Sequence, residues 1–140
     1  MADRKKSVLV LCTGNSARSQ MMEAILSDRL GHLLTAASAG TEPAARVNPL
    51  AIRALEEIGI AHGGGEPKTP DAFGDTEFDV VVTVCDHAKE TCPILPGAPV
   101  QVHVGYPDPA AAEGTEEERL NAFREVRDHM LAWTELCRLI

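Results

Sequence analysis

Residues 6–12 carry an unbroken apolar run, Val8 to Leu11, that ends at a cysteine, and a glycine-containing loop and a helical pattern follow it. Apolar runs without alternation are typical of parallel strands that are buried on both faces. Residues 18–30 place apolar side chains at helical spacing and end before Gly31, which predicts a helix. Strand, loop and helix in this order predict the first unit of a parallel sheet, in which ligands bind at the carboxyl ends of the strands.

The rest of the chain continues this alternation of strands and helices. The elements predicted after residue 30 are a strand over 33–38, a helix over 49–58, a strand over 78–85, a strand over 100–104 and a closing helix from Thr115 onward. The glycine-rich stretch 63–67 is too short to separate domains. The sequence therefore predicts one α/β domain over residues 1–140, a three-layer fold with a four-stranded, mostly parallel sheet and helices on both faces.

Charge and hydropathy argue against several classes of function. The 140 residues include 13 Lys and Arg against 21 Asp and Glu, a formal net charge of −8, which opposes binding to nucleic-acid phosphates. No apolar run approaches the roughly 18 residues of a membrane helix, and the apolar stretch after Lys6 is too short for a signal peptide. We expect a cytoplasmic monomer that binds neither nucleic acid nor membrane, with its four cysteines mostly reduced in the resting cell.

The loop after the first strand has the composition of an oxyanion site. It consists of Cys12, five further residues and Arg18, and it lies between a strand and a helix. Gly14 permits a backbone that turns successive N–H groups inward, and the following helix adds its positive end. Arg18 can bind two oxygens of an anion, and the same positive groups favour the reactive thiolate of Cys12, to which Ser19 can donate a hydrogen bond. The predicted substrate-binding residues are Thr13, Gly14, Asn15, Ser16, Ala17, Arg18 and Ser19.

A simpler interpretation treats Cys12 as a core residue at the end of a strand and Arg18 as a solvated surface charge. A cysteine and an arginine six residues apart are common by chance. The glycine, the small polar residues and the position between a strand and a helix favour the oxyanion site.

A second cysteine, Cys85, ends another predicted parallel strand, so that it and Cys12 can face one crevice at the same sheet edge. Cys92 follows seven residues later. Residues at this separation on an intact helix lie roughly 10 Å apart along its axis, whereas a disulfide needs Cα atoms within about 7 Å. If the segment between Cys85 and Cys92 is helical when reduced, it must unwind before the two can form a disulfide.

Other interpretations of the cysteines remain open. In one of them, Cys85 is only a buried residue at the end of a strand, and Cys92 is a surface thiol. These two cysteines, His87 and His103 are individually suitable zinc ligands, but their spacing fits no standard zinc finger, and we predict no metal site of this kind. Cys137 lies among apolar residues of the closing helix, and we assign it no role.

Four pieces of the chain together resemble the low-molecular-weight protein tyrosine phosphatase superfamily and, within it, the thioredoxin-coupled arsenate reductases. The resemblance extends over essentially the whole chain. The matching pieces are the loop Cys12–Ser19, the strand end Val82–Cys85, the segment Cys92–Pro96 and the pair Asp108–Pro109. The phosphatases share the loop and the Asp-Pro pair but are not expected to share Cys85 and Cys92.

This resemblance implies a relay of thiols with thioredoxin as the partner. Cys12 attacks arsenate, for which phosphate or sulfate is an analogue, while Asp108 protonates the departing oxygen. Cys85 then attacks the Cys12 sulfur and expels arsenite, and Cys92 attacks Cys85 to leave a disulfide that thioredoxin reduces. The alternative for Asp108, which lies between two prolines, is a residue that only forms a turn.

The resemblance also marks one possible ion and two departures from relatives. In some relatives a potassium ion stabilises the loop, and Asn15, Glu23 and Ser38 occupy the matching positions. No obligatory cofactor is expected. Pro107 stands where relatives often have an acidic residue, which changes the electrostatics beside the implied acid. Ala17 replaces a second loop cysteine of other relatives and so removes a competing thiol.

Two other functions would use the same loop. A protein tyrosine phosphatase would need Cys12, Arg18 and Asp108 and would leave Cys85 and Cys92 idle. A non-enzymatic oxyanion-binding or redox-sensing module would need no acid. Because phosphate and arsenate have nearly the same shape, weak phosphatase activity is expected of an arsenate reductase as well.

Overall fold

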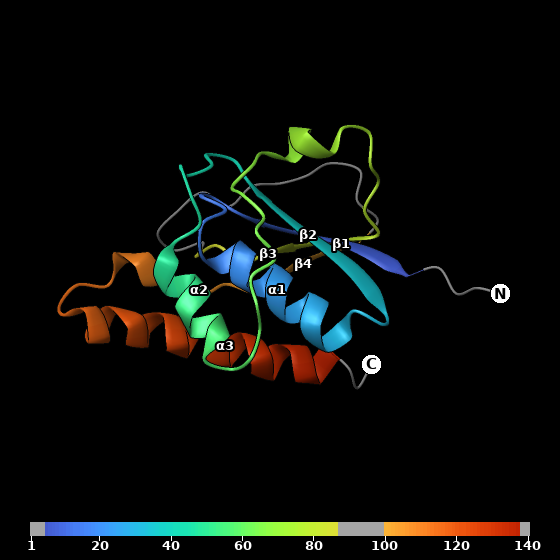
Figure 1. Cartoon of the computed structure of the whole chain (residues 1–140). Helices are drawn as coiled ribbons and strands as arrows, with labels where there is room; N and C mark the ends of the chain where they lie inside the picture. Colours follow the sequence, from blue (N-terminus) through green and yellow to red (C-terminus); the bar gives the residue numbers. More distant parts are fainter. Residues whose placement is uncertain (1–4, 87–99, 138–140) are drawn as a thin grey trace.

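The computed structural model describes residues 5–86 and 100–137. Within these residues a four-stranded sheet has the order β2-β1-β3-β4, and each neighbouring pair of strands is parallel. The strands are β1 (Lys6–Cys12), β2 (Leu34–Gly40), β3 (Val80–Thr83) and β4 (Val100–His103). Their carboxyl ends lie at one edge of the sheet, where Cys12 ends β1 (Figure 1). The predicted four-stranded parallel sheet is confirmed.

Three α-helices and two short 3-10 helices accompany the sheet in the described residues. They are α1 (Arg18–Leu30), α2 (Pro49–Glu56), α3 (Glu116–Cys137), η1 (Pro70–Phe73) and η2 (Pro109–Ala111). Asn48 caps α2, because its side chain accepts the Leu50 N–H at 2.9 Å. Thr115 and Glu118 bond each other's backbone N–H at the start of α3, a capping box. None of these helices combines the length and apolar character needed to cross a membrane.

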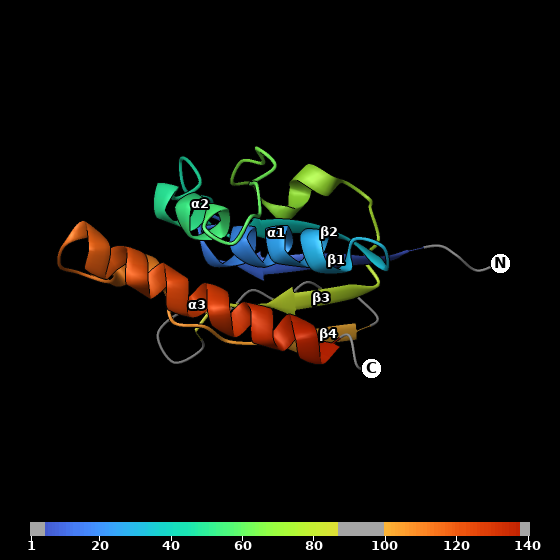
Figure 2. The same ribbon diagram turned by 60° about the horizontal axis from the view of Figure 1, so that its bottom comes forward.

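Apolar side chains cover the two faces of the sheet unequally. Val8 and Val10 of β1 belong to the larger cluster, which also contains the buried side chains of all three α-helices. Leu9 and Leu11 face the other way, and Phe73 of η1 packs against them. Figure 2 shows α3 beside β3 and β4, whereas α1 lies over β1 and β2. In the described residues the predicted three layers therefore consist of α-helices on one face and a 3-10 helix on the other.

The bounds of β1 and α1 are those predicted, and the other elements differ at their ends. β2 extends to Gly40, α2 stops at Glu56, β3 is limited to 80–83 and β4 stops at His103. The helix α2 ends early because Ile58 and Gly59 donate their N–H groups to carbonyls three residues back. Gly59 then takes a φ of 80°, which a helix does not permit.

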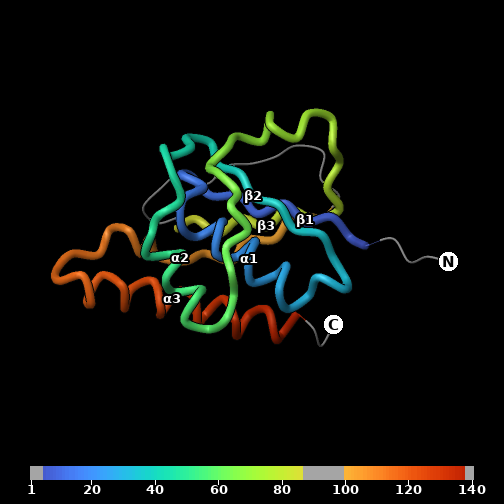
Figure 3. The backbone as a smooth tube through the Cα atoms, in the orientation of Figure 1, coloured from blue at the N-terminus to red at the C-terminus, as the bar shows by residue number. Residues whose placement is uncertain are grey.

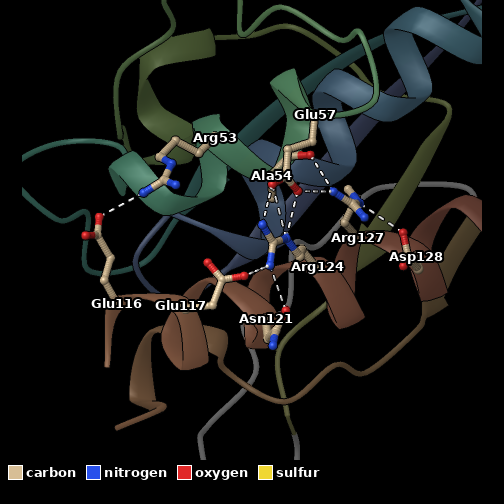
Figure 4. A network of polar contacts seen from close by, with 9 residues as sticks. All are labelled: Arg53, Ala54, Glu57, Glu116, Glu117, Asn121, Arg124, Arg127 and Asp128. Atoms are coloured by element: carbon tan, nitrogen blue, oxygen red, sulfur yellow. Dashed lines mark hydrogen bonds and ion pairs between the residues drawn. The ribbon is translucent and has the colours of Figure 1, made fainter. Parts of the chain in front are cut away.

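Two arginines of α3 bind the residue that follows α2 (Figure 4). Arg124 donates to both carboxylate oxygens of Glu57, with Nη2 2.6 Å from Oε2. Arg127 donates to Glu57 Oε1 at 2.9 Å and to the Ala54 carbonyl at 2.8 Å. The hydrogen bonds from Arg124 and then from Arg127 lower the pKa of Glu57 from 4.5 to about 2. This cluster fastens α3 to α2 on the face of the sheet that carries the larger core.

We expect the Glu57→Gln variant to have a smaller free energy of unfolding than the unchanged protein at about pH 7, because an amide cannot make charge-assisted bonds to both arginines. Since the folded state depresses the pKa of Glu57, this stabilisation is present above the unfolded pKa of 4.5 and is lost as the pH falls toward 2. Urea unfolding at about pH 7 and about pH 3.5 should show a smaller deficit at the lower pH.

Glu116→Gln is the matched control for this prediction. Glu116 pairs with Arg53 at 2.8 Å, but both side chains are largely exposed, so its loss should barely change stability. A deficit of Glu57→Gln that is the same at both pH values would mean that shape, and not charge, explains its effect.

Candidate active site

A neighbouring segment, residues 42–48, anchors the loop between β1 and α1 (Figure 3). Three of its backbone N–H groups donate to loop carbonyls over 2.8 to 2.9 Å, and the pairs are Glu42 with Thr13, Ala44 with Gly14 and Asn48 with Ser16. In a trans peptide the N–H points away from the carbonyl of the same peptide group. The N–H groups that follow these three carbonyls therefore point away from the 42–48 segment, which suits the predicted oxyanion site.

Gly40 lets the end of β2 approach this loop closely. A Cβ at this position would lie 2.4 Å from the Thr13 carbonyl oxygen and 2.9 Å from the Asn15 nitrogen. Any side chain at position 40 would displace the loop backbone. The spacing of apolar residues marks Gly40 only as the end of a strand, so this packing could not be predicted from it.

Asn15 has a strained backbone that its neighbours hold in place. Its φ is 48°, in the left-handed region that residues other than glycine rarely adopt. Its Nδ2 donates to Ser19 Oγ at 2.7 Å, and its Oδ1 accepts the backbone N–H of Lys68 at 3.0 Å. Gln20 Nε2 donates to the Asn15 carbonyl at 3.2 Å. These contacts around a fully buried residue fix the curvature of the loop.

Cys12 lies at the base of the loop with 2% of its surface exposed. Its Sγ accepts the Asn15 backbone N–H at 3.2 Å and lies 2.9 Å from the Ser19 hydroxyl oxygen. Because Asn15 Nδ2 already donates to that oxygen, the hydroxyl proton of Ser19 can point at the sulfur. Two donors that converge on the sulfur suit a thiolate, the form in which cysteine is a nucleophile.

Arg18 begins α1 and is 5% exposed. Its Nη1 donates to the Tyr106 carbonyl at 3.2 Å, which joins the anion loop to the loop that carries Asp108. Burial raises the pKa of the Tyr106 hydroxyl to about 12. That hydroxyl stays protonated near neutral pH and cannot serve as a base there.

Asp108 is exposed and caps η2, because its Oδ1 accepts the Ala110 N–H at 3.0 Å. This is the turn-forming contact that the sequence allowed as the alternative to an acid. The contact occupies one carboxylate oxygen, and the second makes no hydrogen bond to a described residue. The carboxyl can therefore cap η2 and still offer an oxygen to a ligand at the neighbouring loop.

Cys85 lies two residues beyond β3, at the same edge of the sheet as Cys12. The Val84 N–H donates to the Leu11 carbonyl at 3.0 Å, so β1 and β3 stay paired up to the residues that precede both cysteines. Cys85 is fully buried and disulfide-bonded, whereas Cys12 and Cys137 are free thiols. The first two predicted relay cysteines are thus brought together, and Cys92 lies outside the described residues.

No group of three or more His, Cys, Asp or Glu side chains within residues 5–86 and 100–137 could hold a metal ion. The ring of His103 instead lies with Nδ1 2.8 Å from Thr83 Oγ1, and His87 is outside the described residues. Cys137 ends α3, and burial raises the pKa of its thiol. A raised pKa makes this thiol a poor nucleophile near neutral pH, which fits its lack of an assigned role.

The three positions named for potassium lie around the loop. The Ser38 hydroxyl donates to Glu23 Oε1 at 2.6 Å, and Asn15 supports the loop as described above. The sequence patterns did not identify Gln20 or Lys68, although both bind Asn15. Of these two, Gln20 could have been found from the sequence, because it is a polar residue on the buried side of α1. Lys68 bonds Asn15 through its backbone, which leaves no residue-type signal.

Known proteins similar to this chain identify its family. The family model of low molecular weight phosphotyrosine protein phosphatases matches residues 7–134. The arsenate reductase of Halalkalibacterium halodurans is 46% identical over 126 residues, which cover 90% of each chain. The chain belongs to the arsenate reductases of this family. The predicted superfamily is confirmed, and so is the predicted membership of the arsenate reductases within it.

Solved structures of arsenate reductases share this fold. An arsenate reductase in its phosphate-binding state matches with a TM-score of 0.73 and 27% identity, over 94% of this chain and 95% of that one. The thioredoxin-dependent arsenate reductase of Corynebacterium glutamicum matches with a TM-score of 0.61 and 25% identity, over 98% of this chain and 65% of that one. The match confirms the predicted phosphatase-like fold.

Proposed function

We propose that this member of the arsenate reductases reduces arsenate to arsenite with electrons from Cys12 and Cys85, and that Cys92 passes the resulting disulfide to thioredoxin. The observation that carries the proposal is that the cysteine of an oxyanion loop ends β1, while a second buried cysteine lies two residues beyond the neighbouring strand β3, at the same sheet edge. A phosphatase needs only the first cysteine. The second supplies the redox partner that reduction requires.

Substrate binding depends on local groups, because the net charge of −8 repels anions over the surface as a whole. A tetrahedral oxyanion in the loop would accept hydrogen bonds from backbone N–H groups and from Arg18, and α1 points its positive end at the same place. The Arg18 side chain is held by the Tyr106 carbonyl, so little conformational freedom is lost on binding.

In the first step the Cys12 thiolate attacks arsenic, and one oxygen leaves as water after Asp108 donates its proton. Arsenic stays As(V) in the resulting thiol ester. In the second step the Cys85 thiolate attacks the Cys12 sulfur. The sulfur–arsenic bond breaks, its electron pair stays on arsenic, and As(III) leaves as arsenite. The two thiols are thereby oxidised to a disulfide.

In the third step the Cys92 thiolate attacks the Cys85 sulfur, which restores the Cys12 thiolate. The dithiol of thioredoxin then reduces the Cys85–Cys92 disulfide. Cys85 is disulfide-bonded in the structure while Cys12 is a free thiol. The states of these two cysteines support the proposal, which gives Cys85 a disulfide and Cys12 a free thiol before thioredoxin acts.

A coupled assay tests the whole proposal. Purified protein with thioredoxin, thioredoxin reductase and NADPH should consume NADPH only after arsenate is added. Phosphate in place of arsenate should give no consumption, since it cannot be reduced under these conditions. Consumption that does not depend on arsenate, or none with arsenate, would contradict the proposal.

A phosphatase remains the second candidate, because the family model that matches the chain is named for that activity. Both enzymes would use Cys12, Arg18 and Asp108. Weak hydrolysis of an aryl phosphate is expected of this chain. Hydrolysis that is faster than arsenate reduction would make phosphatase the main activity.

The Asp108→Asn variant should form the Cys12 adduct about 10²-fold more slowly, because an amide has no acidic proton to give to the leaving oxygen. Oxyanion affinity should change little, since an amide oxygen can still accept the Ala110 N–H. Single-turnover arsenite release and calorimetric titration with phosphate measure the two quantities. Glu113→Gln, at an exposed carboxylate nearby in the chain, is the control. An unchanged rate of arsenite release would show that Asp108 only caps η2 and is not the general acid.

We also propose that the chain works as a monomer in the cytoplasm with thioredoxin as its protein partner. The proposed relay returns its cysteines to thiols after each turnover, which a reducing compartment with thioredoxin supports. Light scattering on the purified protein should give the mass of one chain.

A further inference from the structure

We propose that Lys68 is a positioning residue for the oxyanion loop, and that its ammonium group takes the place that a bound monovalent cation would occupy beside Ser38. This inference rests on the proposed role of the Cys12 loop as an oxyanion site. It adds a residue that has no part in the cysteine relay itself.

Lys68 binds the outer side of β2, the edge strand of the sheet. Its carbonyl accepts the Gly40 N–H at 2.8 Å, and its Nζ donates to the Ser38 carbonyl at 3.3 Å. Residues 38 and 40 are two apart on the strand, so their backbone groups point the same way. Ser38 is fully buried, and its carbonyl needs a donor that the edge of the sheet does not provide.

The same residue reaches the loop. The Lys68 backbone N–H donates to Asn15 Oδ1 at 3.0 Å, and the backbone N–H of Asn15 donates to Cys12 Sγ at 3.2 Å. Lys68 therefore links the end of β2 to the strained residue that holds the nucleophile. Loss of the ammonium contact would free the Lys68 segment from Ser38 and weaken the support of Asn15.

The predicted potassium ligands do not fit a resident ion in this chain. Three of their oxygens already have donors: Lys68 N–H on Asn15 Oδ1, Lys68 Nζ on the Ser38 carbonyl, and the Ser38 hydroxyl on Glu23 Oε1. A potassium ion would compete for the Ser38 carbonyl with an ammonium group and would meet its charge at short range. The ammonium group of Lys68 thus places a positive charge beside the Ser38 carbonyl without a bound ion.

Removal of this ammonium should make the site depend on potassium. In the Lys68→Met variant the stem keeps its apolar bulk but the Ser38 carbonyl loses its donor, and carbonyl oxygens are good potassium ligands. Calorimetric titration of the reduced proteins with phosphate, in KCl and in choline chloride of equal ionic strength, measures this. We expect wild-type affinity to differ less than about twofold between the salts. Lys68→Met should bind about tenfold more weakly in choline chloride and regain most of the loss in KCl.

Two further variants control the experiment. Lys5→Met removes an exposed lysine before β1 and should behave as wild type in both salts. Lys68→Arg keeps a cation and should bind phosphate in choline chloride within about threefold of wild type. Thermal unfolding of Lys68→Met in each salt shows whether the chain is folded during the titration.

Several outcomes would overturn the inference. They are a wild-type protein that itself needs potassium, a Lys68→Met variant that binds normally in choline chloride, and one that potassium does not restore. If wild type binds no phosphate in either salt, the oxyanion site itself is wrong. The rate of Cys12 alkylation by iodoacetamide, followed by peptide mapping in both salts, then decides the role of Lys68, because it needs no oxyanion. A Lys68→Met rate that matches wild type in both salts would overturn that role.

Discussion

The Cys12→Ser variant should reduce arsenate about 10⁴-fold more slowly than wild type, or not at all, and should lose any phosphatase activity. A serine hydroxyl stays protonated near neutral pH even with the donors that Asn15 and Ser19 supply. It also cannot form the disulfide that carries two electrons away from arsenic. Arsenite release per mole of enzyme, with a chemical thiol or with thioredoxin as donor, measures the loss.

Cys137→Ser is the matched control, because it makes the same substitution at a partly buried thiol at the end of α3. It should keep wild-type turnover. Calorimetric titration of Cys12→Ser with phosphate should still detect binding, since the loop backbone and Arg18 are unchanged. Substantial arsenate reduction by Cys12→Ser would show that another residue is the nucleophile.

The periodicity of apolar residues was enough to predict β1 and α1 to the residue. Both elements are long, and a glycine or a change in periodicity marks their ends. β3 is less well defined, because a fully buried apolar run does not reveal where its pairing with β1 stops. The strand itself covers only residues 80–83, although the Val84 N–H still bonds the Leu11 carbonyl beyond its end.

Periodicity also does not reveal which face of the sheet a helix covers. The pattern of α2 predicts an apolar side, and the structure shows that this side shares one core with α1 and α3. The other face receives Phe73 and Phe78, whose short segment has no helical periodicity. The distribution of helices over the two faces could therefore be read only from the three-dimensional structure, and not from the sequence.

The chemistry of the site was visible in residue types, whereas its support was not. The side chains of Cys12, Arg18 and Ser19 indicate an anion-binding loop. The 42–48 segment and Lys68 hold that loop largely through backbone N–H and carbonyl groups, which every residue except proline possesses in full. A contact of that kind leaves no trace in residue identity, so it could be found only in the fold.

The Cys92→Ser variant should release about one arsenite per enzyme molecule and then stop. The scheme needs only Cys12 and Cys85 for the reduction itself, because their two thiols supply both electrons. Without Cys92, the remaining thiol is Cys137, whose raised pKa makes it a poor nucleophile, and a disulfide at two buried residues is inaccessible to thioredoxin. Peptide mapping of the stalled protein should find Cys12 linked to Cys85.

The Cys85→Ser variant separates this order from its alternative. A serine cannot attack the Cys12 sulfur to form a disulfide, so this variant should release no arsenite, although Cys92 is intact. Cys137→Ser should turn over repeatedly in the same assay, which shows that loss of a thiol alone does not cause the stall. If Cys85→Ser released one arsenite, Cys92 could resolve the adduct directly. If Cys92→Ser turned over repeatedly with thioredoxin, the third step of the relay would be wrong even though the first two stood.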